Sequence, residues 1–206
     1  MEIKLTNIGK RYRREWIFRK IDLQLKSDTV CGIVGPNGSG KSTLLKLIAQ
    51  AELPSEGEVQ FSKEGKAIGS ETAFATMSIA APYTDVPEQL SLKEFLDFHL
   101  KFSPLKNGLS KDAFLAEIYL VDALDKQIAH FSSGMKQRLK LGLALLSQKP
   151  LVILDEPSSN LDEKGIELYQ KLLKENKEDR IILIGSNEEK KELFIVNEKI
   201  NISDYK

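Results

Sequence analysis

Residues 35–43 read GPNGSGKST, and this glycine-rich run limits the possible folds more than any other segment of the chain. The apolar stretch Val30–Val34 precedes it and is typical of a buried strand. The segment 42–49 that follows contains no glycine or proline and predicts a helix. In this context the pattern G-x-x-x-x-G-K-[ST] forms a phosphate-binding loop. A glycine turn that binds nothing is the alternative, and both flanking segments argue against it.

Each residue type in the loop has a physical role in holding a phosphate. Glycine permits backbone angles that aim successive N–H groups at one anion, and a helix N-terminus adds partial positive charge. Lys41 can reach the β- and γ-phosphates of a nucleotide, and the Ser42 hydroxyl can hold Mg²⁺. The expected binding residues are Gly35, Pro36, Asn37, Gly38, Ser39, Gly40, Lys41, Ser42 and Thr43.

Length and charge limit the remaining possibilities. A chain of 206 residues predicts one domain with room for a subdomain. Lys plus Arg and Asp plus Glu both number 30, and this balance argues against a nucleic-acid partner. The single cysteine, Cys31, falls in the predicted buried strand, which favours packing over chemistry. No signal peptide and no apolar run of roughly 20 residues is evident, so we expect a chain that is soluble by itself.

Alternating strand-like and helix-like segments predict an α/β fold with a mixed, largely parallel sheet and N-terminal antiparallel strands. We expect one domain over 1–206, with a catalytic core at about 1–83 and 149–206 and an inserted helical subdomain at about 84–148. Helix starts are predicted at Ser91, at Ser110 and at Ser132 or Ser133. The expected strands lie at 2–6, 21–25, 30–34, 58–61, 76–79, 151–154, 181–184 and 194–196, and a further helix at 163–176.

Two acids follow a second short apolar strand, Leu151–Leu154. The carboxyl ends of sheet strands are where α/β proteins place ligands, so Asp155 and Glu156 are expected beside the phosphate loop. Asp155 is the predicted partner of Mg²⁺. Glu156 can polarise an attacking water as a general base. A solvated strand end is the alternative, but the phosphate loop earlier in the chain favours the functional interpretation.

Two further motifs carry a family resemblance. Phe131–Arg138 reads FSSGMKQR and resembles LSGGQxxR, the signature of ABC-type ATPases. Ser159–Asp162 reads SNLD and resembles the D-loop that follows the strand acids in that family. The four motifs occur in the family's order, and the resemblance extends from about residue 2 to 200. It implies the ATP-binding and hydrolysing subunit of an ABC transporter, with ATP and Mg²⁺ as cofactors.

The resemblance also implies partners. In ABC ATPases two subunits join head to tail and hold ATP between the phosphate loop of one and the signature of the other. Ser132, Ser133, Gly134 and Asp162 would then face the partner's nucleotide, with an ordinary capped helix as the alternative. A second copy of the chain is the expected partner ATPase. Separate membrane subunits and a peripheral place on the cytoplasmic face follow from the same resemblance.

An aromatic residue is expected to stack on adenine. By resemblance this is Tyr12, and Trp16 is the competing candidate. Spacing to Lys41 favours Tyr12, whereas a packed strand aromatic is the alternative for both. Base–aromatic stacking contributes roughly 1–3 kcal/mol per base in nucleic-acid complexes.

The chain departs from the family at a position expected to be catalytic. Asn187 stands after the strand 181–184, where the family carries a histidine, and both histidines of the chain lie elsewhere. Asparagine can donate a hydrogen bond to a γ-phosphate but carries neither a proton nor a charge. The expected catalytic residues are Glu156, Lys41 and Asn187, with slower hydrolysis than in relatives that have the histidine.

Two more departures concern coupling and the signature. Pro82 aligns with the Q-loop glutamine that joins the metal site to the membrane subunits, and Gln89 is shifted along the loop. In the signature, Ser133 replaces a glycine and Met135 a glutamine, which predicts weakened rather than abolished sandwich formation. The alternatives to a transporter ATPase are a low-turnover nucleotide-gated switch and a non-transport ABC ATPase of DNA repair or translation. Coiled-coil insertions or paired cassettes, which mark the last class, are not evident.

Overall fold

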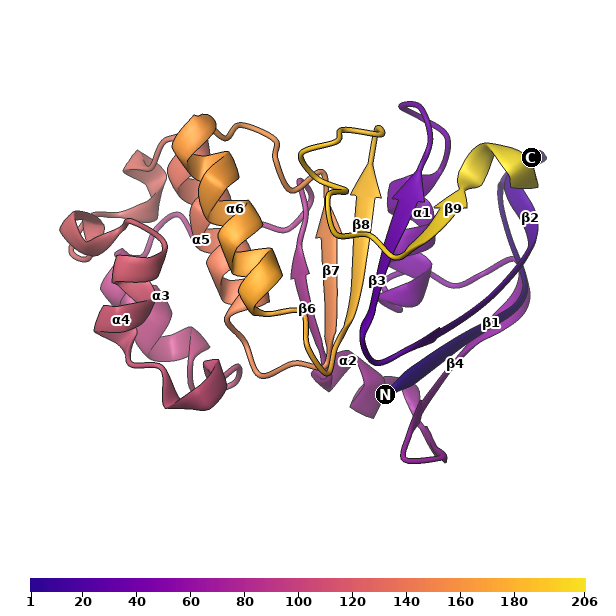
Figure 1. The fold of residues 1–206 in the computed structure, drawn as a ribbon, viewed down its shortest axis with the longest axis horizontal. Helices are drawn as coiled ribbons and strands as arrows, with labels where there is room; N and C mark the ends of the chain where they lie inside the picture. The colour runs from indigo at the N-terminus through magenta and orange to yellow at the C-terminus, as the bar shows by residue number, and fades with distance from the viewer.

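Two β-sheets and the helices packed on them make up the molecule (Figure 1). The computed structural model describes residues 1–206 apart from the side chains of Ser70 and Glu71. One sheet is antiparallel with strand order β2-β1-β4-β5, and the other is parallel throughout with order β6-β7-β8-β3-β9. The α/β class is confirmed, and the parallel and antiparallel strands separate into two sheets.

The antiparallel sheet consists of β1 (Glu2–Tyr12), β2 (Glu15–Lys26), β4 (Glu56–Lys63) and β5 (Lys66–Ile68). The parallel sheet consists of β3 (Thr29–Val34), β6 (Met77–Ala80), β7 (Leu151–Asp155), β8 (Ile181–Ser186) and β9 (Glu198–Asn201). The helices are α1 (Lys41–Ile48), α2 (Ser70–Ala75), α3 (Leu92–His99), α4 (Lys111–Glu117), α5 (Ser133–Leu145) and α6 (Glu163–Glu175). Short 3₁₀ turns lie at Lys106–Gly108, Val121–Ala123, Ile128–His130 and Ile202–Tyr205.

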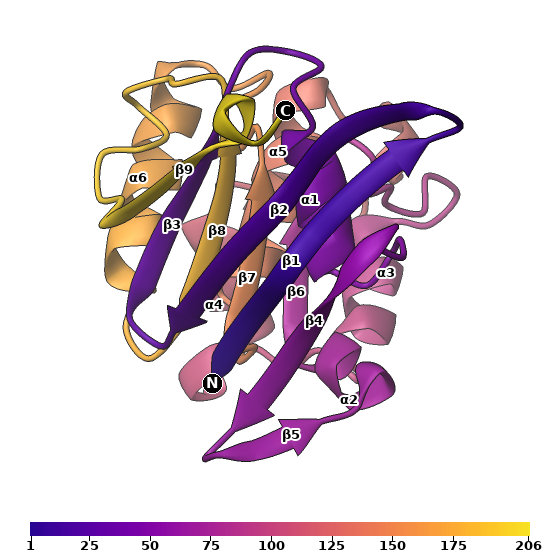
Figure 2. The same ribbon diagram turned by 90° about the vertical axis from the view of Figure 1, so that its right-hand side faces the viewer.

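The parallel sheet separates two hydrophobic cores. Along β7, Leu151 and Ile153 belong to one core while Val152 and Leu154 belong to the other, because alternate side chains of a strand point to opposite faces. The first core holds α1 between the parallel sheet and the antiparallel sheet, and Figure 2 shows the antiparallel sheet lying over α1. The second core joins the opposite face to the helical segment between β6 and β7 and to α6.

Local sequence signals set the helix starts as predicted. Ser91 caps α3 in a complete capping box with Glu94. Ser110 accepts a hydrogen bond from the backbone N–H of Ala113 at 3.1 Å and caps α4. Ser132, one of the two candidates, accepts from Met135 N–H at 3.2 Å and caps α5. None of the helices in the described part of the chain is both long and apolar enough to cross a membrane.

The predicted last strand is wrong. Residues 194–195 form a turn and residue 196 is irregular. The last strand is β9, two residues further along the chain, and half of its residues are exposed. The apolar side chains before β9 serve packing instead, because Leu193 and Val196 lie within 3.3 Å of a Cβ built on Gly32. β5 and α2 were not predicted from the sequence, since each is short and weakly patterned.

Candidate active site

The glycine loop joins β3 to α1 at the carboxyl edge of the parallel sheet (Figure 1). Gly35, Gly38 and Gly40 have φ angles of 149°, 75° and 111°, in the region that favours glycine. A Cβ at Gly40 would approach Ile17 Cγ2 to 2.5 Å, and a Cβ at Gly35 would approach Ser39 Oγ to 2.7 Å. The loop therefore requires glycine at these two positions both for its conformation and for the space around it.

Lys41 opens α1 and bends back over the loop. Its Nζ donates to Gly35 O at 2.9 Å, to Pro36 O at 3.1 Å and to Asn187 Oδ1 at 2.5 Å. Burial lowers the pKa of Lys41, whereas the carboxylates of Glu156 and Asp155 act in the opposite direction. The candidate catalytic residues Lys41, Glu156 and Asn187 thus lie together although the sequence separates them widely.

Asp155 ends β7 and carries a buried carboxylate. It is 1% exposed, and neither oxygen has a hydrogen-bond partner in the part of the chain that the structure describes. Burial raises its pKa and the charge of Glu156 adds to that rise, while the nearby Ser42 hydroxyl, although outside hydrogen-bonding geometry, and Lys41 oppose it. Leaving a buried carboxylate unpaired is costly, so this geometry fits a site that a cation completes.

The donor set suits Mg²⁺. Carboxylate and hydroxyl oxygens are its preferred protein ligands, and Mg²⁺ is commonly held by one or two carboxylates together with substrate phosphates. The described residues contain no group of three or more His, Cys, Asp or Glu that could hold a metal alone. Asp155 and Ser42 are therefore the residues that would hold the ion, with phosphate oxygens supplying further ligands.

Gly185 makes room for Asp155, and sequence reasoning missed it. It pairs with Asp155 across β7 and β8. A Cβ there would lie 2.5 Å from Asp155 Oδ1 and 2.8 Å from Leu45 Cδ1. The available signal was an isolated glycine in an otherwise apolar strand, which often marks a close approach of other atoms.

Glu156 follows Asp155 with a left-handed backbone, φ 48°. Its N–H donates to Gly185 O at 2.9 Å, and Ser159 Oγ donates to its Oε2 at 3.4 Å. Non-glycine residues with positive φ are uncommon and cluster at functional sites. The turn separates the direction of the Glu156 side chain from that of Asp155, so the two neighbouring acids can serve different roles.

Tyr12 lies at the tip of the β1–β2 hairpin, and Trp16 lies nearby. The Tyr12 hydroxyl donates to Glu52 Oε2 at 2.5 Å, and its ring is 45% exposed. Burial raises the pKa of Tyr12 and its bond to Glu52 adds to that rise, whereas Thr43 of the glycine loop lowers it. One cation lies over the Tyr12 ring, Lys10 Nζ at 5.0 Å from its centroid, whereas two guanidinium groups lie over the Trp16 ring, Arg19 at 4.1 Å and Arg11 at 5.5 Å. This arrangement favours Tyr12 as the aromatic that a base can reach.

The signature residues lie at the start of α5. Ser132 and Ser133 are exposed, and a Cβ at Gly134 would lie 3.1 Å from Asn160 O. Gln137 is buried and donates through Nε2 to Pro157 O at 2.9 Å, which fastens α5 to the segment after β7. Within the described residues no hydrogen bond or ion pair joins Ser132–Gly134 to the glycine loop, so the predicted site residues form two groups.

Asp162 is exposed and caps α6, accepting a hydrogen bond from Gly165 N–H at 2.8 Å. At the expected Q-loop position, Pro82 is exposed at the surface. The neighbouring Tyr83 is also exposed, at 39%, but one side of its ring faces the site, with Lys46 Nζ 4.5 Å from the ring centroid. Burial raises the pKa of Tyr83 well above its usual range, and the charges of Asp155 and Glu52 add to this.

Comparison with known proteins supports the resemblance. The family model described as ABC transporter matches residues 18–159. The cytochrome c biogenesis ATP-binding export protein CcmA of Haemophilus influenzae is 30% identical over 100% of this chain and 97% of its own length. An uncharacterized ABC transporter ATP-binding protein of Bacillus subtilis, YcbN, is 29% identical over 84% of this chain, which spans 58% of that relative.

Solved structures agree. The ATP-binding subunit of an ABC transporter is 26% identical and matches with a TM-score of 0.75 over 90% of this chain and 79% of that one. A bacterial Atm1-family ABC exporter with ATP bound matches in fold, with a TM-score of 0.79 at 18% identity, covering 97% of this chain and 37% of that one. The chain therefore belongs to the ABC transporter family, as an ATP-binding subunit with ATPase character.

Proposed function

We propose that the chain hydrolyses Mg²⁺-bound ATP with Lys41 and Glu156 as its central catalytic residues. Lys41 contacts the developing charge on the transferred phosphoryl group, and Glu156 accepts the proton of the attacking water. A bound Mg²⁺ supplies charge neutralisation on the phosphates, with Asp155 and Ser42 as its protein ligands. The observation that carries the proposal is the buried Asp155 carboxylate, unpartnered among the described residues, beside Lys41 and Ser42.

The site is completed by a second copy of the chain. Ser132, Ser133 and Gly134 start a helix with exposed N–H groups, an arrangement that attracts anions. Their separation from the glycine loop supports a head-to-tail dimer in which they face the partner's ATP, with Asp162 near the same boundary. Tyr12 stacks on the adenine.

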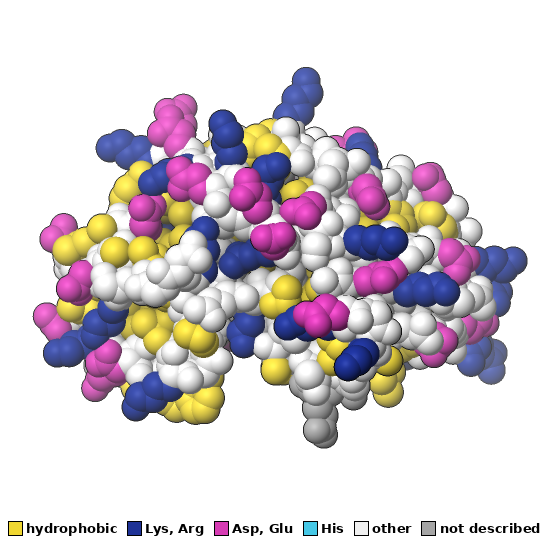
Figure 3. Space-filling view, turned by 60° about the horizontal axis from the view of Figure 1, so that its bottom comes forward, with side chains coloured by type: hydrophobic (Ala, Val, Ile, Leu, Met, Phe, Trp, Pro, Cys, Tyr) yellow, Lys and Arg dark blue, Asp and Glu magenta, His cyan; other side chains and the backbone are white. Residues whose placement is uncertain are grey.

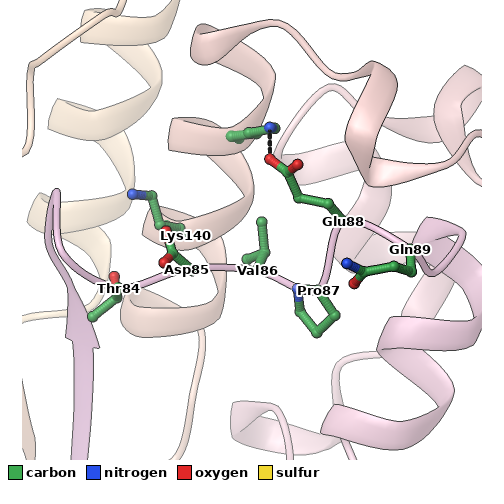
Figure 4. A pocket seen from close by; sticks show the side chains of 8 residues that line it. Thr84, Asp85, Val86, Pro87, Glu88, Gln89 and Lys140 are labelled. Carbon is green, nitrogen blue, oxygen red and sulfur yellow. Dashed lines mark hydrogen bonds and ion pairs between the residues drawn. The ribbon is translucent and has the colours of Figure 1, made fainter.

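A groove beside the site is the proposed docking surface for membrane subunits. It has a volume of about 550 Å³ and is bounded by the segment after Tyr83 and by α5 (Figure 4). Lys140 donates to Ala81 O at 2.9 Å and Lys136 pairs with Glu88, so both helix and loop are fixed. The exposed Phe98 of α3 and Phe102 in the turn after it add apolar surface to the same helical segment. The lining residues are Thr84, Asp85, Val86, Pro87, Glu88, Gln89, Lys136 and Lys140.

The chain then acts as a peripheral subunit on the cytoplasmic side of a membrane, with residues 1–83 and 149–206 as catalytic core and 84–148 as helical subdomain. Figure 3 shows basic and acidic side chains interspersed over one face, which supports the expectation of no nucleic-acid partner. Relatives named for export and for zinc uptake match at similar identity. The proposal therefore covers ATP-driven transport and does not name the substance that is transported.

Steady-state ATPase activity of the purified protein and of Glu156→Gln, with light scattering in Mg-ATP, tests the proposal. We expect hydrolysis by the wild type, none by Glu156→Gln, and a dimer trapped with ATP in the variant. Hydrolysis that survives in Glu156→Gln would remove Glu156 as the base.

A low-turnover switch is the second candidate, favoured by Asn187. Its Oδ1 accepts from Lys41, and an amide cannot take up a proton from the reaction. This candidate predicts ATP-dependent dimerisation with negligible turnover even when the membrane subunits are present.

A further inference from the structure

Glu192 is a buried carboxylate that none of the sequence motifs covers. It lies in the segment after β8, five residues beyond Asn187, and is 3% exposed. Among the described residues its carboxylate forms no ion pair. Burying a charge without a cationic partner is unfavourable unless hydrogen bonds compensate, so the contacts that hold Glu192 identify what it serves.

Those contacts converge on Ser158. Glu192 Oε1 accepts from Ser158 N–H at 3.0 Å and from Ser158 Oγ at 2.6 Å. Ser158 itself is 7% exposed. Hydrogen bonds to an ionised acceptor are roughly twice as strong as neutral ones, so this pair holds the Ser158 backbone firmly. The main-chain oxygen of Glu192 also accepts from the hydroxyl of buried Tyr169 on α6, at 2.9 Å.

Ser158 lies at a sensitive position. It follows Glu156 by two residues, where the backbone has just passed through a left-handed turn. Beyond it, Asn160 also has a positive φ of 60°, and its carbonyl faces Gly134 of the signature. A bond that fixes Ser158 therefore constrains both the general base and the segment next to the signature helix.

The same residue lies within electrostatic reach of the phosphate-binding lysine. The negative charge of Glu192 acts with those of Glu156 and Asp155 to favour the charged form of Lys41. β7 pairs with β8, and α6 shares the hydrophobic core on one face of these strands, so Glu192 connects the loops and the helix that surround the site.

We propose that Glu192 is a positioning residue for hydrolysis: its bonds to Ser158 hold Glu156 in place and tie the Asn187 segment to residues 158–162. This inference rests on the proposed role of Glu156 as the base. It assigns Glu192 no contact with ATP. Removing it is therefore expected to slow turnover while leaving nucleotide affinity intact.

Glu192→Gln is the first test, because it retains an acceptor oxygen and the size of the side chain while removing the charge. We expect kcat to fall about 10- to 100-fold, since small displacements of a catalytic group have effects of that order. KM for ATP and the Kd of Mg-ATP should change less than about twofold, the range a residue without substrate contact allows. Glu188→Gln is the matched control, because Glu188 is exposed in the same segment and, among the described residues, its one ion pair is with Lys199.

Ser158→Ala tests the hydrogen bonds between Ser158 and Glu192 by changing the donor residue. This test does not depend on whether the Glu192 variant folds. It removes one of the two donors, so we expect a smaller loss of kcat with the same unchanged Kd. In the double variant Glu192→Gln with Ser158→Ala, the losses should be less than additive because both act through one contact.

Three results would overturn the inference. The first is a normal kcat in both folded variants, Glu192→Gln and Ser158→Ala. The second is a double variant whose loss of kcat equals the full sum of the two single losses. The third is a loss of activity that merely follows the loss of folded protein. The role of Glu156 fails separately, if Glu156→Gln still turns over. A Glu156→Gln variant that is inactive beside a fully active Glu192→Gln variant rejects only the role of Glu192.

Discussion

Asp155→Asn is expected to stabilise the nucleotide-free protein while abolishing its response to Mg-ATP. The wild-type carboxylate is buried with both oxygens unpartnered among the described residues, and such a group destabilises the fold by about 1–3 kcal/mol. The neutral amide removes the charge at constant size. The amide also loses the attraction between the carboxylate and Lys41, which offsets part of this stabilisation. We therefore expect the free energy of unfolding of the nucleotide-free variant to rise by about 1–2 kcal/mol.

Thermal unfolding with and without Mg-ATP measures both effects. For a chain of 206 residues, 1 kcal/mol corresponds to roughly 2–4 °C, so Tm should rise by about 2–8 °C without ligand. With Mg-ATP at about 100 times its Kd, the wild type gains about 2.7 kcal/mol and the variant little of it. Asp155→Asn is therefore expected to be more stable than the wild type without ligand and less stable than the wild type with Mg-ATP.

The pH dependence of unfolding provides an independent check that the charge of Asp155 causes the difference in stability. A carboxyl whose pKa is raised in the folded state destabilises that state when charged, so the cost is present above this pKa and is relieved as pH falls below it. The advantage of Asp155→Asn should therefore be largest above the raised pKa of Asp155 and shrink as the pH falls through it. Asp125→Asn, an exposed change, is the control and should leave Tm unchanged. A folded Asp155→Asn variant that is no more stable than the wild type at any pH in the titration would refute the reasoning.

Four further predictions follow from single features of the structure. Tyr12→Ala should weaken ATP binding about 5- to 150-fold, the equivalent of 1–3 kcal/mol of stacking, and leave tripolyphosphate binding unchanged in calorimetry. Gly185→Ala should lower stability by about 1–3 kcal/mol in urea unfolding, because its Cβ would lie 2.5 Å from Asp155 Oδ1. Asn187→His should raise turnover stimulated by the membrane subunits, and an equal or lower rate would contradict the expected role. Burial raises the pKa of Cys31 to about 12, so its thiol should resist alkylation at pH 8 until the protein unfolds.

Local signals in the sequence were sufficient to predict the positions of the glycine loop and of the helix starts. A serine at an N-cap satisfies backbone donors within three residues, so Ser91, Ser110 and the pair Ser132 or Ser133 could be proposed without knowledge of the fold, and the structure shows that Ser132 is the cap. Lys41 and Asp155 also stand in recognisable patterns, since Lys41 follows the glycine loop after β3 and Asp155 is the last residue of β7. These assignments depend on short-range chemistry that the sequence displays.

Other features depend on contacts between distant segments. Glu52 bonds Tyr12 across 40 residues and Glu192 bonds Ser158 across 34, and neither acid stands in a motif. The apolar residues 194–196 suggested a strand because hydrophobicity alone does not separate strand packing from loop packing. Ile195 and Val196 are half-buried against the core while Phe194 is exposed, and only tertiary structure distinguishes this loop packing from a strand.

The bonds of Lys41 suggest how nucleotide arrival is sensed. An ammonium group has three donors, and all three are used, by the carbonyls of Gly35 and Pro36 and by the side chain of Asn187. A phosphate that contacts Lys41 must therefore displace at least one of these acceptors. The two carbonyls belong to the glycine loop itself, whereas Asn187 is exposed on a separate segment and can turn its amide donors toward the phosphate. Glu192 holds the same segment to Ser158, so the segment that carries Asn187 is bonded to the chain two residues from Glu156.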